Sequence, residues 1–353
     1  MTVASPETPE TDLPLLPALG WQAFFADQLA PEEPHPPIRI TEVHRNGLRG
    51  RGEGLAPIIP PTVPATVGDW VLYDAETPAA SRVLERKSLI KRRAAGHERQ
   101  TQLIAANIDT VFITTSCNQD FNIARLERYV ALVLDAGVAP VIVLTKADLC
   151  DDPEVYVAQA QTITDLVPVV VLDARFQDPK IKLAQWCGQG QTVAFLGSSG
   201  VGKSTLTNAL TETEAMLTQG IREDDAKGRH TTTRRELHLI PQGCAVIDTP
   251  GMRELQLTDA AYGVAALFPD LHALSTACKF RDCKHLTEPG CAVRAAEASG
   301  TVDLERLARW EKLAAEEKAN TAVLQTRKST DKTSGSNLKY MKRNIPKGPK
   351  RRR

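Results

Sequence analysis

The spacing of hydrophobic and polar positions changes twice along the chain. From about residue 38 to residue 96, short alternating segments such as IRITEVHRNG and VGDWVLYD are broken by Gly and Pro, which predicts a small β-barrel. After residue 105, apolar strands alternate with helical segments, which predicts a parallel sheet with right-handed crossovers. A stretch rich in Cys and His follows, and then the helical segment DLERLARWEKLAAEEKA.

The α/β stretch can be divided further. NIDTVFITT indicates a buried strand, and NIARLERYVALVLDAG indicates an amphipathic helix that Gly137 closes. The strand APVIVLTKAD, a helix near residues 153–166, the strand PVVVLDA, another helix and the strand QTVAFLGSSG come next. Strand-like stretches at about 236–240 and 244–248 complete the pattern. The fold class is therefore α/β with a doubly wound parallel sheet.

These patterns predict five parts. They are a flexible lead over residues 1–35, a barrel over 36–98, an α/β domain over 99–256, a metal-binding domain over 257–326 and a disordered basic tail over 327–353. Within the lead, LGWQAFFADQL could form a short helix.

Composition and the chain start set the broad class. The 353 residues have the composition of an ordinary soluble protein, and no apolar run approaches the length of a membrane span. The start, MTVASPETPETDLP, is acidic and Pro-rich and lacks the basic and apolar regions of a signal peptide. We therefore expect a cytoplasmic location and no membrane partner.

Charge is unevenly distributed although the net charge is zero. Residues 327–353 hold eleven Lys or Arg and one acid, a net of +10, and the remaining residues carry −10. A basic tail on an acidic body predicts a polyanionic partner, although a solubilising tail has the same composition. Basic residues in the barrel loops are compatible with nucleic acid and equally with a plain structural module. They are Arg45, Arg49, Arg51, Lys91, Arg92 and Arg93.

A phosphate-binding loop follows an apolar strand. GSSGVGKST fits the pattern G-x-x-x-x-G-K-[ST], in which backbone N–H groups and a helix N-terminus surround phosphates. Lys203 is expected to reach the β- and γ-phosphates, and the Ser204 hydroxyl to bind Mg²⁺. A Gly/Ser turn between strand and helix is the alternative. The predicted nucleotide contacts are Gly197, Ser198, Ser199, Gly200, Val201, Gly202, Lys203, Ser204 and Thr205.

Two further segments complete a γ-phosphate site. VIDTPG places Asp248 at the end of an apolar strand, where a carboxylate holds Mg²⁺ through water, and the Gly251 N–H can sense the γ-phosphate. Before it lies the polar segment GRHTTTRREL, in which Thr232 or Thr233 is the candidate for binding Mg²⁺ only in the triphosphate state. An ordinary flexible linker is the alternative for this segment.

The stretch TKAD predicts the choice of base. Guanine offers the N1–H and N2–H₂ donors, and the acceptor-only carboxylate of Asp148 can accept both, whereas adenine presents an acceptor at N1. Lys146 can cover the base with its aliphatic stem, and Ala147 completes the loop. Asn is usual where Thr145 stands, so an amide able to brace the loop is lost. Ala174 lies where a second base-side loop would contribute a backbone N–H.

The order of these motifs is unusual. The base-reading loop TKAD and the second base-side loop with Ala174 come first, and the phosphate loop, the segment with Thr232 and Thr233 and the D-x-x-G segment DTPG follow. Joining the old termini, and opening the chain between the D-x-x-G segment and the base loop, produces this order and leaves the strand neighbours unchanged. A circular permutation therefore explains all five loops at once.

With these motifs the chain resembles the circularly permuted, ribosome-small-subunit-dependent GTPases of the RsgA type. The resemblance covers nearly the whole chain and includes VGDWV, NIDTVFI, TKAD, GSSGVGKST, GRHTTT and DTPG. It implies an N-terminal OB-fold, a permuted GTPase domain and a C-terminal zinc domain. It also implies GTP and GDP, the small (30S) ribosomal subunit and its 16S rRNA as partners of a monomer. Its expected role is late subunit maturation, with subunit-stimulated hydrolysis and nucleotide-controlled release of assembly factors.

Three of the seven cysteines gather near one histidine. Cys278, Cys283, His285 and Cys291 are spaced as C-x4-C-x-H-x5-C, which predicts a closed, structural Zn²⁺ site, and this spacing also matches the family. The segment has few large apolar residues, so metal would supply its folding energy. Unrelated core thiols are the alternative. The four scattered cysteines are expected to be small core residues: Cys117, Cys150, Cys187 and Cys244.

Hydrolysis needs a positioned water molecule. Met252 stands just after D-x-x-G, where many small GTPases have Gln, and its side chain cannot orient water, so slow intrinsic turnover is predicted. His230, beside the switch threonines, is the candidate to position water once a partner orders the loop. Two other functions compete with a GTPase. Asp148 argues against a metabolic P-loop kinase or ATPase, and the intact phosphate loop with Asp248 argues against a non-enzymatic RNA-binding scaffold.

Overall fold

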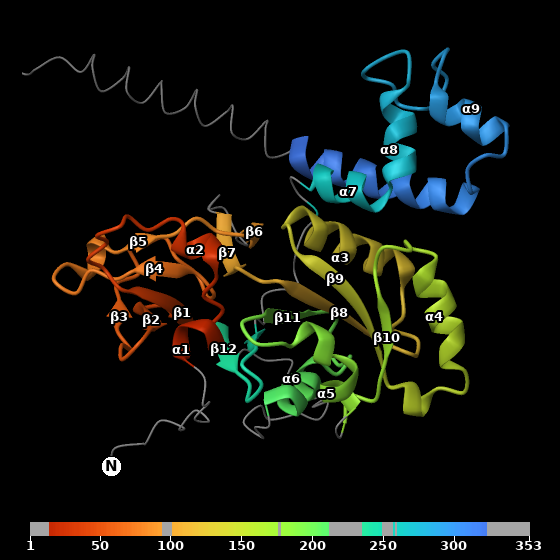
Figure 1. The fold of residues 1–353 in the computed structure, drawn as a ribbon. Helices are drawn as coiled ribbons and strands as arrows, with labels where there is room; N and C mark the ends of the chain where they lie inside the picture. The colour runs from red at the N-terminus through yellow and green to blue at the C-terminus, as the bar shows by residue number, and fades with distance from the viewer. Residues whose placement is uncertain are drawn as a thin grey trace, which may run out of the picture.

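The computed structural model describes the fold of residues 14–93, 101–175, 178–211, 235–248, 257 and 260–322. Three parts follow one another along the chain: a small antiparallel sheet, a mainly parallel sheet flanked by helices, and a helical C-terminal part (Figure 1). The fold class predicted from the sequence is confirmed. Within these residues no helix combines the length and apolar character that a membrane crossing requires.

The N-terminal sheet has the strand order β3-β2-β1-β4-β5, with antiparallel neighbours throughout. Its elements are β1 Pro37–His44, β2 Gly47–Arg51, β3 Ile58–Ile59, β4 Trp70–Leu72, the 3₁₀ turn η1 Pro78–Ala80 and β5 Arg82–Val83. Their buried side chains form a small apolar core of Ile38, Ile40, Leu48, Ile59, Val63 and Val71. In the described residues no pairing joins β3 to β5, so closure into an OB-fold barrel stays a prediction.

The described part of the lead, residues 14–35, contains the short helix that was possible in LGWQAFFADQL, but it packs on the protein and differs in this from the expected flexible segment. Helices α1 (Leu15–Ala18) and α2 (Ala23–Ala26) pack on the N-terminal sheet, and Leu19 and Phe25 are buried. The Trp21 ring stacks on Phe25 and meets Trp70 of β4 edge-on at 4.8 Å between ring centroids. Aromatic burial of this kind outweighs the entropy that keeps a polar, Pro-rich lead mobile.

A separate hairpin connects the two sheets. β6 (Leu89–Arg93) pairs with β7 (Thr101–Ala106) and with no other described strand. The expected boundary between residues 98 and 99 therefore lies inside this hairpin, in the part of the chain outside the described residues. β7 runs on directly into the first strand of the parallel sheet.

The central sheet has the order β10-β9-β8-β11-β13-β12. All neighbours are parallel except β12, which is antiparallel to β13. The strands are β8 Thr110–Ser116, β9 Ala139–Thr145, β10 Val169–Val171, β11 Thr192–Leu196, β12 Arg235–Leu239 and β13 Ala245–Asp248. The phosphate-loop strand β11 lies in the middle of this sheet. Along the chain it comes after β9 and β10, the strands that the base-side loops follow. This arrangement is the one expected when a sheet keeps its neighbours and the chain termini move.

Alternating side chains bury both faces of the central sheet. One face packs with α3 and α4 through Val111, Ile113, Ile142, Leu144, Ala194 and Leu196. The other packs with α6 through Phe112, Val141, Val143, Val193, Phe195 and Val246. The helices and turns of this domain are α3 Ile123–Asp135, η2 Ala147–Leu149, α4 Pro153–Gln161, α5 Asp178–Lys182, η3 Ala184–Trp186 and α6 Lys203–Thr211. Asn122 caps α3 by accepting from the Arg125 N–H, and Gly137, with a φ of 72°, follows its end.

The two sheets are joined at β1. Residues Glu42 and Val43 of β1 pair with Glu236 and Arg235 of β12, so the N-terminal sheet and the central sheet form one continuous sheet, from which the β6–β7 hairpin is separate. Arg39 on β1 is fully buried and donates hydrogen bonds to the carbonyls of Leu19, Gly68 (3.2 Å) and Asn107 (3.1 Å). Burial lowers the pKa of Arg39 to about 10. This guanidinium therefore links the lead, the N-terminal sheet and the entry to β8.

The C-terminal part contains α7 Ala261–Leu267, α8 Pro269–Thr276, α9 Ala292–Ala298 and a helix over residues 304–322. It packs on α3 of the central domain, as Figure 1 shows. Gly263 of α7 lies so close to α3 that an added Cβ would meet the Ala131 carbonyl oxygen at 1.9 Å. Two ion pairs join α3 to the helix over residues 304–322: Arg309 Nε to Glu127 Oε1 at 2.7 Å, and Arg128 Nη2 to Glu316 Oε2 at 2.6 Å.

Candidate nucleotide-binding site and metal cluster

The predicted nucleotide loops gather at one edge of the central sheet. β8, β9, β10, β11 and β13 run parallel, so their carboxyl ends lie together. The phosphate loop follows β11, the TKAD loop follows β9, and the loop with Ala174 follows β10. Asp248 ends β13. Segments distant in the sequence thus meet at one place because strand order, not chain order, decides which loops are neighbours.

The phosphate loop turns on glycines. Gly197 follows β11 and lies against β8, where an added Cβ would be only 2.1 Å from the Thr114 carbonyl oxygen. Gly202 has a φ of 98°, which residues with a Cβ rarely adopt, and it directly precedes α6. The loop therefore needs glycine at both ends to pass from the strand to the helix.

Lys203 begins α6 and spans the loop. Its Nζ donates to the carbonyl oxygen of Gly197 at 2.8 Å and also to that of Ser198. Ser204 is exposed in the first turn of the same helix. An ammonium and a hydroxyl at a helix N-terminus form an arrangement suited to a polyphosphate and its cation.

The TKAD loop turns sharply at Lys146. That residue has a φ of 57°, in the left-handed region, and the 3₁₀ turn η2 follows with Asp148 at its centre. The Asp148 side chain is 27% exposed. A carboxylate in this position can accept hydrogen bonds from a ligand outside the sheet edge.

Thr145 braces the TKAD loop. Its side chain is fully buried, and Oγ1 lies 2.7 Å from the Val201 carbonyl oxygen of the phosphate loop and 3.1 Å from the Thr115 carbonyl oxygen at the end of β8. A hydroxyl donates one hydrogen, so the shorter contact is the better bond. A hydroxyl at this buried position thus links the TKAD loop to the phosphate loop, although the amide that is usual there is absent.

The loop after β10 carries a residue that the sequence reasoning missed. Ala174 is buried, and its Cβ lies 3.6 Å from where a Cβ on Gly202 would be, so the loop touches the phosphate loop. The next residue, Arg175, donates from Nη2 to Asp148 Oδ2 at 2.5 Å and to Asp173 Oδ2 at 2.9 Å. The only sequence signal was a basic residue beside the predicted base-side alanine.

Asp248 lies at the same edge of the central sheet. It ends β13 opposite Glu236 of β12, so the chain before β12 enters at this same edge. The catalytic candidates lie outside the described residues: His230, Thr232, Thr233 and Gly251. Their placement stays a prediction.

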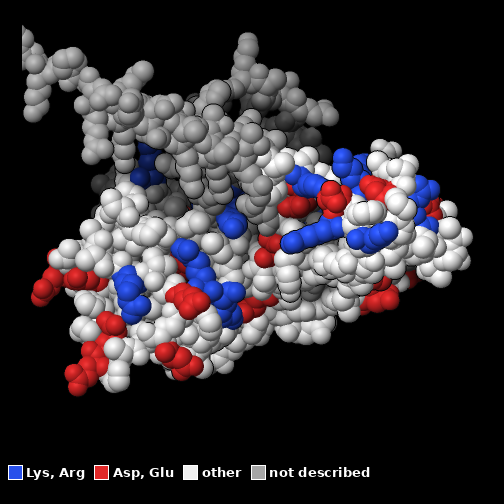
Figure 2. Space-filling view, turned by 90° about the horizontal axis from the view of Figure 1, so that it is seen from above, with Lys and Arg blue, Asp and Glu red and all other residues white. Residues whose placement is uncertain are grey.

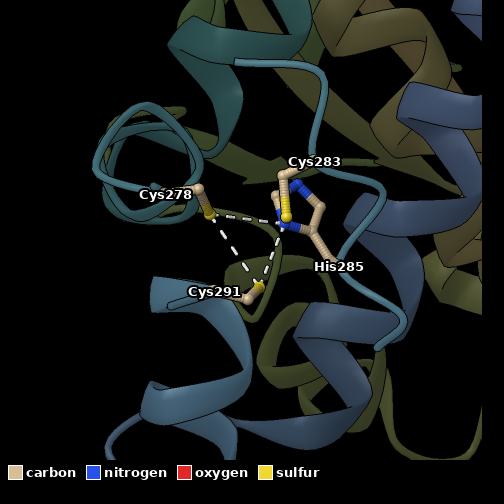
Figure 3. Close-up of side chains that lie close together, drawn as sticks. All are labelled: Cys278, Cys283, His285 and Cys291. Carbon is tan, nitrogen blue, oxygen red and sulfur yellow. Dashed lines mark hydrogen bonds between the residues drawn. The ribbon is translucent and has the colours of Figure 1, made fainter. Parts of the chain in front are cut away.

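The Cys/His cluster comes together in the C-terminal part. Cys278 follows α8, Cys291 caps α9, and the loop between them supplies Cys283 and His285, so that the four side chains point toward one another (Figure 3). Their ligand atoms all lie within 4.8 Å of one another. The Sγ atoms of Cys278 and Cys291 are 3.9 Å apart, and His285 Nδ1 lies 3.6 Å and 3.4 Å from them.

These separations fit a tetrahedral zinc site. A Zn–S distance of ~2.3 Å places two sulfurs ~3.8 Å apart, and a sulfur and a nitrogen about 3.5 Å apart. Burial raises the pKa of Cys283 to about 11, and the neighbouring thiols add to this rise. At Cys278 burial opposes ionisation, but backbone N–H groups at the start of α9 outweigh it and lower the pKa of the thiol. Thiols packed this closely repel one another when they ionise, so a dication among them would stabilise their thiolate forms.

A carboxylate holds the cluster loop in shape. Glu288 accepts hydrogen bonds from the N–H groups of Lys284 (2.9 Å), Leu286 (2.8 Å) and Thr287 (3.0 Å). These bonds lower the pKa of Glu288 to about 2. His285 lies inside this turn with a φ of 59°, and its ring lies 5.6 Å from that of Trp310. The turn thereby aims the imidazole at the three sulfurs.

The other four cysteines lie apart from this cluster. Cys117, Cys187 and Cys244 are buried, and Cys150 is partly buried. Cys187 and Cys244 belong to the same apolar cluster beneath α6, where hydrogen bonding to Cys187 and burial raise the pKa of Cys244. This environment agrees with the expected role as small core residues.

Charges of both signs are scattered over the face that bears the C-terminal helices. Figure 2 shows Lys and Arg side chains with Asp and Glu side chains among them over the described part of that face. Two of the basic residues expected in the barrel loops have polar neighbours. Arg49 of β2 has its Nε 3.7 Å from Glu42 Oε2, and Arg92 of the β6–β7 hairpin donates from Nε to Gln102 Oε1. The described residues visible on this face therefore form no continuous patch of positive or of negative charge.

Comparisons with known proteins agree with this geometry. A family model described as RsgA GTPase matches residues 83–258. A model of ABC transporters matches residues 183–334, a range that shares the phosphate loop but leaves out the TKAD loop. Curated relatives include the small ribosomal subunit biogenesis GTPase RsgA of Mesorhizobium japonicum, 52% identical over 88% of this chain and 92% of that protein. RsgA 2 of Vibrio parahaemolyticus is 48% identical over 90% of each chain.

Solved structures share the fold. YjeQ from Thermotoga maritima superimposes with a TM-score of 0.57 and 24% identity, over 79% of this chain and 97% of that one. YloQ, described as a circularly permuted GTPase, gives a TM-score of 0.52 with 25% identity over 82% of this chain and 98% of that one. The permuted order inferred from the motifs is therefore also found in a known fold.

Proposed function

This chain belongs to the RsgA GTPase family, and from that membership we propose how its residues bind GTP, hydrolyse it and engage the small ribosomal subunit. The protein is a GTP hydrolase that acts in small-subunit biogenesis. The observation that carries the assignment is the sheet edge at which the phosphate loop lies together with the TKAD loop, which contains Asp148.

Asp148 is proposed to select the base. An ionised carboxylate only accepts hydrogen bonds, so it can pair with N1–H and N2–H₂ of guanine and repels the N1 acceptor of adenine. Lys146 and Ala147 would lie along the base with Ala174 contributing its N–H from the next loop. Thr145 would hold this loop to the phosphate loop through its bond to Val201.

The phosphate loop is proposed to bind the phosphates through backbone N–H groups and Lys203. On binding, the Lys203 ammonium would exchange its carbonyl partners for β- and γ-phosphate oxygens. Ser204 and, through water, Asp248 would hold Mg²⁺, which neutralises charge between the phosphates. The hydroxyl and carboxylate donors at this edge suit a hard cation.

Hydrolysis by the isolated protein is expected to be slow, because Met252 cannot orient water. We propose that His230 positions the attacking water once the subunit orders its segment, that Thr232 or Thr233 binds Mg²⁺, and that the Gly251 N–H senses the γ-phosphate. The test is a His230→Ala variant. If its subunit-stimulated turnover equals that of the unaltered protein, the role of His230 is wrong.

The remaining parts are proposed to engage the subunit. The N-terminal sheet, as an OB-fold over residues 36–98, and the basic tail over 327–353 would contact 16S rRNA of the 30S particle, with the protein acting as a cytoplasmic monomer. The C-terminal domain over 257–326 would be shaped by one structural Zn²⁺ on Cys278, Cys283, His285 and Cys291. Nucleotide state would control subunit binding and assembly-factor release, and the pairing of β12 with β1 gives it a path to the N-terminal sheet.

Phosphate release from GTP and from ATP, with and without purified small subunits, tests this function. We expect GTP turnover that rises strongly with subunits and little turnover of ATP. Equal use of ATP would point to a different P-loop enzyme, and GTP turnover indifferent to subunits would remove the proposed coupling. Asp148→Asn provides a matched control. Its amide keeps the size of the side chain but places an N–H donor against a donor of guanine. The affinity for guanine nucleotides should therefore fall at least about 100-fold.

A further inference from the structure

Arg175 connects the two base-side loops. It lies on the loop after β10, and its Nη2 contacts Asp148 on the loop after β9 at 2.5 Å. The same side chain forms a two-point pair with Asp173, from Nε to Oδ1 at 3.0 Å and from Nη2 to Oδ2 at 2.9 Å. One guanidinium therefore holds a carboxylate on each loop.

The Asp173 end of this arrangement is anchored. The Asp173 N–H donates to Asp178 Oδ2 at 2.8 Å, and Asp173 Oδ1 also accepts from the Arg175 N–H at 2.9 Å. The hydrogen bonds with Arg175 lower the pKa of Asp173 and raise that of Arg175. A planar fork paired at two points is fixed in orientation, which a single contact does not achieve.

We propose that Arg175 is a positioning residue that orients the Asp148 carboxylate for guanine. The inference rests on the proposed function, in which Asp148 reads the base, and goes beyond it by naming what aims that carboxylate. The terminal torsion of Asp is broad, so an untethered carboxylate samples many orientations. A bond from a fixed guanidinium to Oδ2 selects among them before the base arrives.

Arg175 and guanine can share Asp148. An ionised carboxylate has about four acceptor sites, and Arg175 uses one of them on Oδ2, so sites on both oxygens remain for the two guanine donors. The charge of Arg175 does not cancel that of Asp148, because Asp173 is paired with the same guanidinium. The charges of these three side chains, two carboxylates and one guanidinium, sum to −1.

A second model, in which Arg175 competes with guanine for Asp148, predicts the opposite effect of removing Arg175. If Arg175 only occupied the acceptor sites that guanine needs, its removal would tighten guanine nucleotide binding. A positioning role predicts weaker binding, and the loss must be larger for a base that uses both oxygens. Hypoxanthine lacks the N2 amino group and offers one donor, so it depends less on how the carboxylate is turned.

The test compares GDP and inosine diphosphate affinities of the full-length protein. For Arg175→Ala we expect GDP affinity to fall about fivefold, inosine diphosphate affinity to fall less, and the melting temperature to stay unchanged. Arg175→Lys keeps the charge without the planar fork and should resemble Arg175→Ala. Arg82→Ala is the matched control: its side chain is 55% exposed, as is that of Arg175, and its ion pair with Glu33 lies far from the base loops in the sequence.

Asp173→Asn examines the anchor. We expect a smaller loss of GDP affinity in the same direction, and the double variant Asp173→Asn/Arg175→Ala should bind no worse than Arg175→Ala alone. Tighter GDP binding, unchanged binding, or equal losses for both nucleotides after Arg175→Ala would overturn the proposal. Failure of the underlying function looks different, because the unaltered protein would then show no preference for GDP over ADP.

Discussion

The nucleotide edge and the Cys/His cluster both gather residues from separate segments, yet different forces hold them. At the edge, strand pairing places the loops, and both faces of the sheet are buried. In the cluster, the chain between α8 and α9 has little regular structure. Its Cys and His side chains converge with their ligand atoms at separations that suit a single metal ion. Loops on a sheet keep their places without a ligand, whereas a loop closed by side chains depends on what those side chains bind.

The contrast extends to exposure. Residues that carry the edge, such as Thr145 and Leu196, are fully buried. Around the cluster Phe280 and Leu286 are exposed, with side chains in solvent that a larger core would cover. The edge therefore draws stability from the domain core, and the cluster must draw it from the metal and from docking on α3.

Metal removal should give the largest effect. A strong chelator, or Cys283→Ser, is expected to unfold the segment from Cys278 to Cys291, because structural zinc contributes on the order of 10 kcal/mol to such folds. Hydrogen exchange measured by mass spectrometry should show fast exchange there and unchanged protection over β11 and α6. Equal loss of protection at the phosphate loop would show that the two regions are not held independently.

Lys203→Ala should break chemistry at the edge without breaking the fold. Loss of the ammonium removes charge stabilisation from the transferred phosphate, and subunit-stimulated GTP turnover should fall about 1000-fold. The melting temperature should stay within a few degrees, because β11 and α6 are held by the sheet and its core. A large drop in melting temperature would mean that the Lys203 bonds to Gly197 and Ser198, and not the strands, maintain the loop.

Arg309→Ala sharpens the comparison at the junction. The Glu127 side chain is 2% exposed, and losing its partner leaves a buried charge that costs about 3 kcal/mol at neutral pH. Burial raises the pKa of Glu127 despite Arg309. A raised acid pKa favours the folded state at low pH, and this contribution is lost as pH rises from the ordinary value through the raised one. Denaturant unfolding should therefore show a deficit that shrinks on acidification.

The control for that variant is Glu127→Gln combined with Arg309→Ala. Removing the charge together with its partner should recover much of the lost stability at neutral pH. If the double variant is as unstable as Arg309→Ala alone, packing of the arginine stem, and not the buried charge, is what docks the C-terminal part.

Thr145→Val should give the smallest effect. It removes the hydroxyl that donates to Val201 and keeps the shape of the side chain, so GDP affinity should fall about fivefold, equivalent to about 1 kcal/mol. Thr145→Ser keeps the hydroxyl and should bind within about twofold of the unaltered protein. Equal affinities for the Val and Ser variants would show that strand pairing alone holds the TKAD loop.

The sequence predicted those parts of the molecule that depend on local pattern. Strand and helix order in the α/β domain, the phosphate loop and the four cluster residues each have a signature within a few residues of chain. Even the permutation was visible, because motif order is a property of the sequence.

What could not be predicted depends on neighbours across space. Nothing near Thr145 shows that Val201 passes within hydrogen-bonding distance, since that closeness arises from the order β9-β8-β11. Arg175 was missed for the same reason: its partner Asp148 lies on another loop. The packing of the lead was not predicted for a similar reason. Leu19 and Phe25 are buried against Trp70, which lies far from them in the sequence.

The pairing of β1 with β12 also matters while the chain is being made. β1 is synthesised early, and β4 pairs with only the first part of it, residues 37–39. The second part, Glu42 and Val43, gains its partner β12 only after the whole phosphate loop has been synthesised. Until then Glu42 and Val43 present open backbone groups, and an open strand edge is a template for pairing with other chains. Translation products that stop before residue 235 would keep that edge open, so aggregation of such fragments is the cost of building the two sheets as one.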